Sequence, residues 1–124
     1  MPDSHLFKDS DAFYSVLAHE LTHWTNRKER APRNFRSTSF GTANYAREEL
    51  VAELGAAFLC ADLQLSLSPR PDHAEYISGW LELLRNDKKA IFQAAAIAQK
   101  ATDFLHSLQP PVGAAADTSI RKIA

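Results

Sequence analysis

The chain has 124 residues, of which 45% are apolar and 23% charged, and its formal net charge is −1. This length and composition predict one folded domain with a hydrophobic core, and they argue against disorder and against a general attraction to nucleic acid. No apolar run reaches the roughly 18 residues needed to cross a membrane, and we expect no secretory signal. The single cysteine, Cys60, excludes an internal disulfide and a Cys-rich zinc site, so we expect a cytoplasmic protein.

Apolar residues recur at helical spacing in four segments, which predicts a mainly α-helical fold with at most a short strand at 35–40. Ser10 or Asp11 is expected to cap the first helix and Asp87 the fourth. The predicted helices are Ser10–Thr25, Asn44–Leu65, Asp72–Arg85 and Lys88–Leu108. We expect a domain over residues 1–108, followed by a flexible C-terminal tail at 109–124.

The apolar residues at helical spacing are expected to face the core, together with Cys60. In the first helix they are Phe13, Val16, Leu17, Leu21 and Trp24. In the second helix they are Leu50, Val51, Leu54, Ala57, Phe58 and Ala61. In the last two helices they are Ile77, Trp80, Leu81 and Leu84, then Ile91, Phe92, Ala95, Ala98, Thr102 and Leu105.

Residues 19–23 read His-Glu-Leu-Thr-His, an H-E-x-x-H motif inside the first predicted helix. Residues four apart lie one above the other on a helix face, so His19 and His23 can converge on one cation. Glu20 would flank the open side of the metal, where a carboxylate acts as a general base toward water. The motif predicts one zinc ion per chain. The alternative is an amphipathic helix whose histidines are ordinary surface residues.

A catalytic zinc ion takes a third protein ligand, and the second predicted helix offers an acidic cluster. Glu49 and Glu53 share one helix face, and we assign Glu49 as the ligand and Glu53 as the acceptor of the free N–H of a ligating histidine. The reverse assignment stays open, as does an acidic first turn that complements the helix dipole. Glu48 lies about 100° away around the helix and is expected to be solvated. The extended three-histidine motif is absent, because Asn26 and Glu29 occupy its Gly and His positions.

Three blocks of the sequence match a known family in order: YSVLAHELTHWT (14–25), YAREELVAELGAAFLCADL (45–63) and HAEYISGWLELLRNDKKAIFQAAAIAQKATDFL (73–105). Through them the chain resembles the C-terminal zincin-like metallopeptidase domain of ArdC-type antirestriction proteins. The resemblance implies a zincin-like peptidase fold with zinc on His19, His23 and an acidic residue of the second block. It also implies a role on plasmids and other mobile elements. By this comparison, we expect the strands that precede the motif helix in zincins to be largely missing here, together with the DNA-binding N-terminal domain of ArdC-type proteins.

Two further groups of residues are weaker candidates. The segment after the first helix is basic, so it would rim a cleft and attract acidic peptides or DNA phosphates, or simply be solvated at a helix C-terminus. Its members are Arg27, Lys28, Arg30, Arg33 and Arg36. His73 and Tyr76 lie one turn apart on the third helix, where either would donate to an oxyanion or have only a structural role.

These residues predict a zinc-dependent metallopeptidase-type hydrolase that acts on a peptide or protein in antirestriction biology. The alternative is a non-catalytic module, stabilised by zinc, that blocks restriction enzymes or contacts DNA through the basic segment without cleaving anything. Separately, a missing N-terminal domain is the expected route to DNA or to a restriction-system protein. Glu20 discriminates between the two, because a structural zinc site needs no carboxylate beside an open coordination position.

Overall fold

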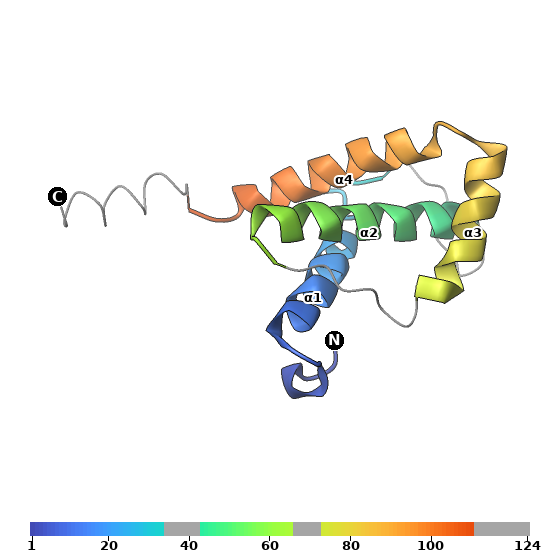
Figure 1. The fold of residues 1–124 in the computed structure, drawn as a ribbon. Helices are drawn as coiled ribbons and strands as arrows, with labels where there is room; N and C mark the ends of the chain where they lie inside the picture. The colour runs from blue at the N-terminus through green and yellow to red at the C-terminus, as the bar shows by residue number, and fades with distance from the viewer. Residues whose placement is uncertain (34–42, 66–72, 111–124) are drawn as a thin grey trace, which may run out of the picture.

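The computed structural model describes residues 1–33, 43–65 and 73–110, with the backbone alone for 73–78, and it contains four α-helices (Figure 1). They are α1 (Ser10–Trp24), α2 (Ala43–Asp62), α3 (His73–Asn86) and α4 (Ala90–Ser107), preceded by a short 3-10 helix at Ser4–Leu6. The described ranges contain no strand, which confirms the predicted mainly α fold. The extended piece expected at 35–40 and most of the expected tail lie outside them. Within them, no helix has the length and apolarity to cross a membrane.

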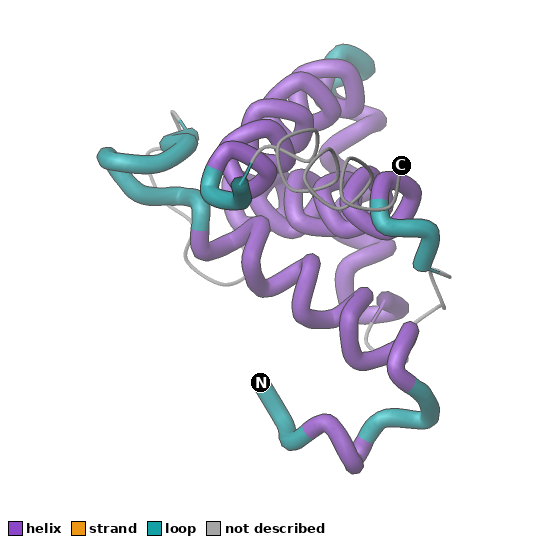
Figure 2. The backbone as a smooth tube through the Cα atoms, turned by 90° about the vertical axis from the view of Figure 1, so that its left-hand side faces the viewer, coloured by secondary structure: helices purple, strands orange, loops and turns teal. Residues whose placement is uncertain are grey.

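Helix α2 lies at the centre of the fold and packs against the other three helices. Helices α2 and α4 run side by side in the same direction, while α1 crosses α2 and α3 stands across the ends at which α2 and α4 begin (Figures 1 and 2). Near the start of α2, Arg47 forms an ion pair with Asp87 at 3.6 Å, and at its end Asp62 Oδ2 lies 2.9 Å from His106 Nε2, within hydrogen-bond distance. This arrangement leaves α2 with almost no solvated face.

The core is built largely from small side chains. The cluster between α2, α3 and α4 consists of Leu50, Val51, Leu83, Ala90, Ala94 and Ala98. A smaller cluster of Ala18, Ala56 and Leu59 joins α1 to α2. Cys60 is 1% exposed, which confirms its predicted place in the core. Alanines let helix backbones approach closely, because no long side chain separates them.

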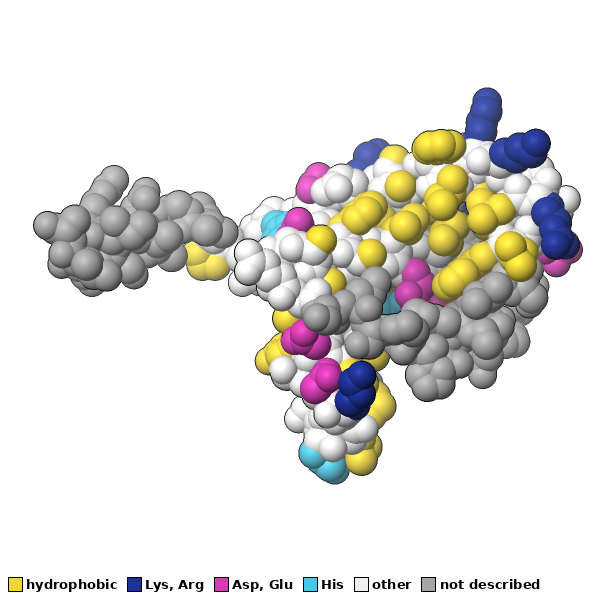
Figure 3. All heavy atoms as spheres, viewed as in Figure 1, with side chains coloured by type: hydrophobic (Ala, Val, Ile, Leu, Met, Phe, Trp, Pro, Cys, Tyr) yellow, Lys and Arg dark blue, Asp and Glu magenta, His cyan; other side chains and the backbone are white. Residues whose placement is uncertain are grey.

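Several large apolar residues that were expected in the core are exposed. Trp24, Ile91 and Phe92 expose 44%, 41% and 75% of their surfaces, and Leu21, Leu81 and Ala61 are exposed as well. The buried faces instead carry mainly small or polar residues: Ser15, Ala18, His19 and Thr22 in α1, and Ala90, Ala94, Ala98, Ala101 and Thr102 in α4. Because the helices meet through these residues, larger side chains remain at the surface, and apolar side chains gather over α2, α3 and α4 in Figure 3.

The helix ends differ from the predicted ones for local reasons. Asp9, rather than Ser10 or Asp11, caps α1, and its carboxylate accepts from the Ala12 N–H at 2.8 Å. Helix α2 stops before Gln64, whose φ of 57° leaves the helical region. The Asp87 carboxylate accepts from the Lys89 N–H at 3.0 Å in a turn, so α4 begins at Ala90 instead of Lys88.

Helices α1 and α2 approach each other closely at Gly55. A Cβ atom at this position would lie 2.6 Å from both Oγ1 and Cγ2 of Thr22, which is closer than side chains tolerate. Thr22 has little freedom to move, because it is fully buried and its hydroxyl donates to the Ala18 carbonyl at 2.8 Å. The glycine therefore sets the distance between the two helices.

We expect Gly55→Ala to lower the free energy of unfolding by about 1–3 kcal/mol, because overpacking forces the helices apart. Gly79→Ala in α3 is the matched control. Its Cβ would meet the Ala46 Cβ at an ordinary 3.6 Å, so the better helix former should stabilise the chain by about 0.5–1 kcal/mol. Urea unfolding of both variants measures the difference. Equal effects of the two substitutions would contradict the close crossing.

Candidate metal centre

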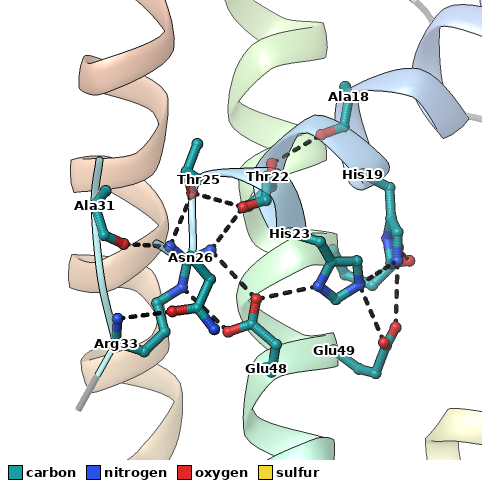
Figure 4. Close-up of polar contacts among 11 residues, drawn as sticks. Ala18, His19, Thr22, His23, Thr25, Asn26, Ala31, Arg33, Glu48 and Glu49 are labelled. Carbon is teal, nitrogen blue, oxygen red and sulfur yellow. Dashed lines mark hydrogen bonds and ion pairs between the residues drawn. The ribbon is translucent and has the colours of Figure 1, made fainter. Parts of the chain in front are cut away.

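Helix α1 presents its two motif histidines to α2. His19 is 3% exposed, whereas the His23 side chain keeps 25% of its surface accessible. Their Nε2 atoms lie 3.1 Å apart, with the rings nearly perpendicular (Figure 4). This is the convergence expected of residues one helical turn apart when both side chains turn toward the same point.

The carboxylate of Glu49 on α2 faces both imidazoles. Its Oε1 lies 3.0 Å from His23 Nε2, and its Oε2 lies 3.2 Å from His19 Nε2. Each residue thereby offers one ligand atom, and the three atoms lie within 4.8 Å of one another. Two nitrogens bound to a tetrahedral zinc ion at about 2.0–2.1 Å are about 3.3 Å apart, so the spacing of the two histidines fits zinc.

Glu53, one turn further along α2, contacts the other nitrogen of His19. Its Oε1 lies 2.7 Å from His19 Nδ1. A carboxylate at this distance would favour the proton on Nδ1 in a metal-bound histidine, so that Nε2 would be free to bind the ion. The structure thus places Glu49 beside both Nε2 atoms and Glu53 behind one histidine. The assignment of ligand and outer carboxylate stays a prediction.

Glu48 and Arg33 occupy places that the sequence did not indicate. The prediction of a solvated Glu48 is wrong, because this residue is 5% exposed and packs beside His23. Arg33 is not on a rim either, since its side chain is 0% exposed and its Nε donates to Glu48 Oε2 at 3.1 Å. Helix α2 is buried on nearly all sides, so a residue 100° from the predicted face still lies inside. No spacing pattern in the sequence signals the Arg33 contact.

The cluster of histidines and carboxylates shifts the proton affinities of its members. Burial acts to lower the pKa of His23, but hydrogen bonds to Glu48 and Glu49 and the charges of both outweigh burial and raise this pKa to about 9. Burial acts to raise the pKa of Glu49, but hydrogen bonds from His19 and His23 and their charges lower this pKa to about 2. Negative charge therefore dominates the centre and favours a bound cation.

A cleft of about 480 Å³ adjoins the partly exposed side of His23. Its lining residues are Glu20, His23, Trp24, Asn26, Arg27, Arg30 and Glu48. Glu20 is exposed and lines this cleft together with His23. Its role as a general base stays a prediction.

The structure describes only some of the remaining candidate residues, those of the basic segment and of the third helix. Arg27 and Arg30 of the predicted basic rim line the cleft, and the guanidinium of Arg30 lies 3.5 Å from the centroid of the Trp24 ring. Lys28 is exposed on the same segment. Arg36 lies outside the described residues, and so do the side chains of His73 and Tyr76 in the first turn of α3. These last three positions stay predictions.

Comparison with known proteins places the chain among related sequences. Residues 1–97 match a family model described as zincin-like metallopeptidase (MPTase-PolyVal). The chain is 50% identical over 109 residues to the uncharacterized protein y4eC of Sinorhizobium fredii (strain NBRC 101917 / NGR234), a match that covers 88% of this chain and 35% of that protein. It is also 38% and 34% identical, each time over 105 residues, to two Escherichia coli proteins named DNA primase TraC. No solved structure matches.

The matches to the two DNA primases cover 85% of this chain but only 10% and 7% of those proteins. The chain therefore spans about a third or less of the length of the curated relatives it matches. The family match, in contrast, includes all of α1, α2 and α3, and with them the whole candidate centre. It confirms the resemblance that the three sequence blocks indicate: the chain belongs to the zincin-like metallopeptidase family.

Proposed function

We propose that the chain is a zinc-dependent metallopeptidase domain in which His19, His23 and Glu49 hold one zinc ion. The observation that carries the proposal is the convergence of three ligand atoms beside a cleft that also contains Glu20. Membership of the zincin-like metallopeptidase family supports a peptide or protein as the substrate. Three protein ligands would leave a coordination position open, as in catalytic rather than structural zinc sites.

Zinc, when bound, supplies Lewis-acid chemistry that polarises the scissile carbonyl and makes water nucleophilic at neutral pH. The Glu20 carboxylate, exposed at the cleft, takes the proton of the attacking water and delivers it to the leaving amine nitrogen. Glu53 holds the Nδ1–H of His19 and so keeps the opposite nitrogen free for the metal.

We further propose that the activity serves antirestriction on mobile elements, in the cytoplasm. This setting is supported by the resemblance to ArdC-type proteins and by the two relatives named DNA primase. The exposed Arg27 and Lys28, next to the cleft, suit an acidic or DNA-bound protein substrate. The same residues suit the alternative function, a zinc-stabilised module that binds DNA or a restriction-system protein without cleaving it. A substitution of Glu20 distinguishes the two functions, because only the peptidase needs this carboxylate.

Glu20→Gln is expected to lower the cleavage rate of fluorescein-labelled casein by about 100-fold or more, because the general base is lost. Zinc affinity should stay within a few-fold of the wild type, since the substitution leaves the three ligand atoms in place. Glu29→Gln, which changes an exposed glutamate in the segment after α1, is the control and should cleave at the wild-type rate. Undiminished cleavage by Glu20→Gln would contradict the assigned base, and no cleavage by the wild type would favour the binding module.

Zinc binding at pH 7 is expected to release close to one proton from His23. With a pKa of about 9 this residue is protonated in the metal-free chain, whereas a zinc ligand must be the neutral imidazole. The apparent affinity should therefore rise roughly tenfold per pH unit from pH 7 to 9. The raised pKa also stabilises the metal-free fold below pH 6.5, and that contribution is lost as the pH rises through about 9.

Titration calorimetry with chelator-buffered zinc, in two buffers of different ionisation enthalpy, measures this proton. A zinc affinity that is independent of pH between 7 and 9, with no proton released, would show that His23 is neutral before binding. The ligand set could then stand, but the electrostatic description of the centre would be wrong.

A further inference from the structure

The buried guanidinium of Arg33 donates five hydrogen bonds. Its guanidinium donates to both carboxylate oxygens of Glu48, at 3.1 and 3.3 Å, and to the Thr25 hydroxyl at 2.8 Å. It also donates to the backbone carbonyls of Thr22, at 2.7 Å, and Ala31. Burial of a charge is costly unless it is paired and fully hydrogen-bonded. This guanidinium meets that condition through Glu48.

Glu48 links Arg33 to the candidate metal centre. Its Oε1, which accepts from Arg33, also lies 3.1 Å from His23 Nδ1, so the carboxylate stands between the guanidinium and the imidazole (Figure 4). With Nδ1 facing Glu48, the Nε2 atom of His23 is turned toward Glu49. Glu53 stands in the same relation to the other motif histidine. Each candidate ligand histidine thus has its own carboxylate from α2.

The charges of this arrangement match a divalent cation. Three carboxyl side chains, those of Glu48, Glu49 and Glu53, lie within one helical stretch, and the buried guanidinium of Arg33 pairs with Glu48. One carboxylate is compensated by the guanidinium, and a divalent ion compensates the other two. Without Arg33, the centre would hold an excess negative charge even when loaded.

The segment that carries Arg33 also forms one wall of the cleft. Within 25–33, the Ala31 N–H donates to the Thr25 carbonyl at 2.9 Å, and the Arg33 N–H donates to the Asn26 side chain at 3.1 Å. Asn26, Arg27 and Arg30 from this segment line the cleft beside His23. The anchor of this wall is therefore the same guanidinium that holds Glu48.

We propose that Arg33 and Glu48 are a positioning pair that orients His23 for the metal and couples metal binding to the conformation of residues 25–33. The inference rests on the proposed zinc site and deepens it, because it assigns the cleft wall to the metal centre. Through this pair, a bound metal stabilises residues 25–33, the wall against which a substrate would lie. A change in the conformation of this wall in turn lowers the affinity for the metal.

Glu48→Gln tests the positioning role directly. It removes the charge that holds both Arg33 and His23 while it keeps the side-chain shape, so we expect zinc to bind about 10–100-fold more weakly in chelator competition. Arg47→Met is the control on the same helix. It removes a partly exposed arginine paired with Asp87 and should leave zinc affinity within twofold of the wild type.

Arg33→Met leaves the buried Glu48 carboxylate without the guanidinium that pairs with it, so this variant is expected to unfold at a lower urea concentration. The double variant Arg33→Met/Glu48→Leu removes both charges and should regain much of that stability. Its zinc affinity should nevertheless stay about 10–100-fold below the wild type, because His23 Nδ1 has lost its acceptor. Zinc affinity that recovers together with stability would mean that the pair is only structural and would overturn the proposal.

Hydrogen exchange of the full chain tests the coupling. Saturating zinc should slow exchange in peptides covering 25–33 of the wild type, and it should do so at least twofold less in Glu48→Gln. Equal slowing in both proteins, or affinities within twofold of each other, would overturn the inference while the zinc site stands. Failure of the wild type to bind zinc would overturn both the inference and the proposed function.

Discussion

The candidate centre depends on the close crossing of α1 and α2. Because Gly55 has no side chain, the buried face of α1 comes near enough to α2 for His19 and His23 to contact three glutamates. A wider crossing would leave the same residues too far apart to share an ion. The small residues of the interface therefore serve the polar cluster as much as the core.

This interface combines apolar packing, which stabilises the fold, with buried charge, which destabilises it. Buried carboxylates cost stability unless cations or donors compensate them. Arg33 compensates Glu48, and protonation of His23 partly compensates Glu49 in the metal-free chain. In the proposed centre a divalent cation would replace that proton with a stronger partner, which would link folding, proton affinity and metal binding at one site.

The sequence predicts the helices and the motif well, because both depend on local spacing. His19 and His23 meet as i, i+4 neighbours, and Glu49 and Glu53 share the helix face that turns to them. The contacts of Glu48 and Arg33 depend instead on how the segment after α1 returns to α2, which no local pattern encodes.

The same limit explains the exposed aromatic residues. Trp24 and Phe92 fit an amphipathic pattern, yet the helices meet through alanine and threonine, and hydrophobic periodicity gives such small residues little weight. Close packing selects residues for size, and size matters only once the neighbouring helix is known.

In the proposed centre, two histidines and one glutamate hold a metal ion. X-ray absorption spectroscopy of the zinc-loaded chain, with zinc content measured on the same sample, tests it most directly. We predict one zinc per chain, with two imidazole nitrogens and oxygen ligands at about 2.0–2.2 Å, and loss of the ion in Glu49→Ala but not in Glu53→Ala. A sulfur ligand near 2.3 Å, or zinc that is retained in Glu49→Ala and lost in Glu53→Ala, would contradict this ligand set.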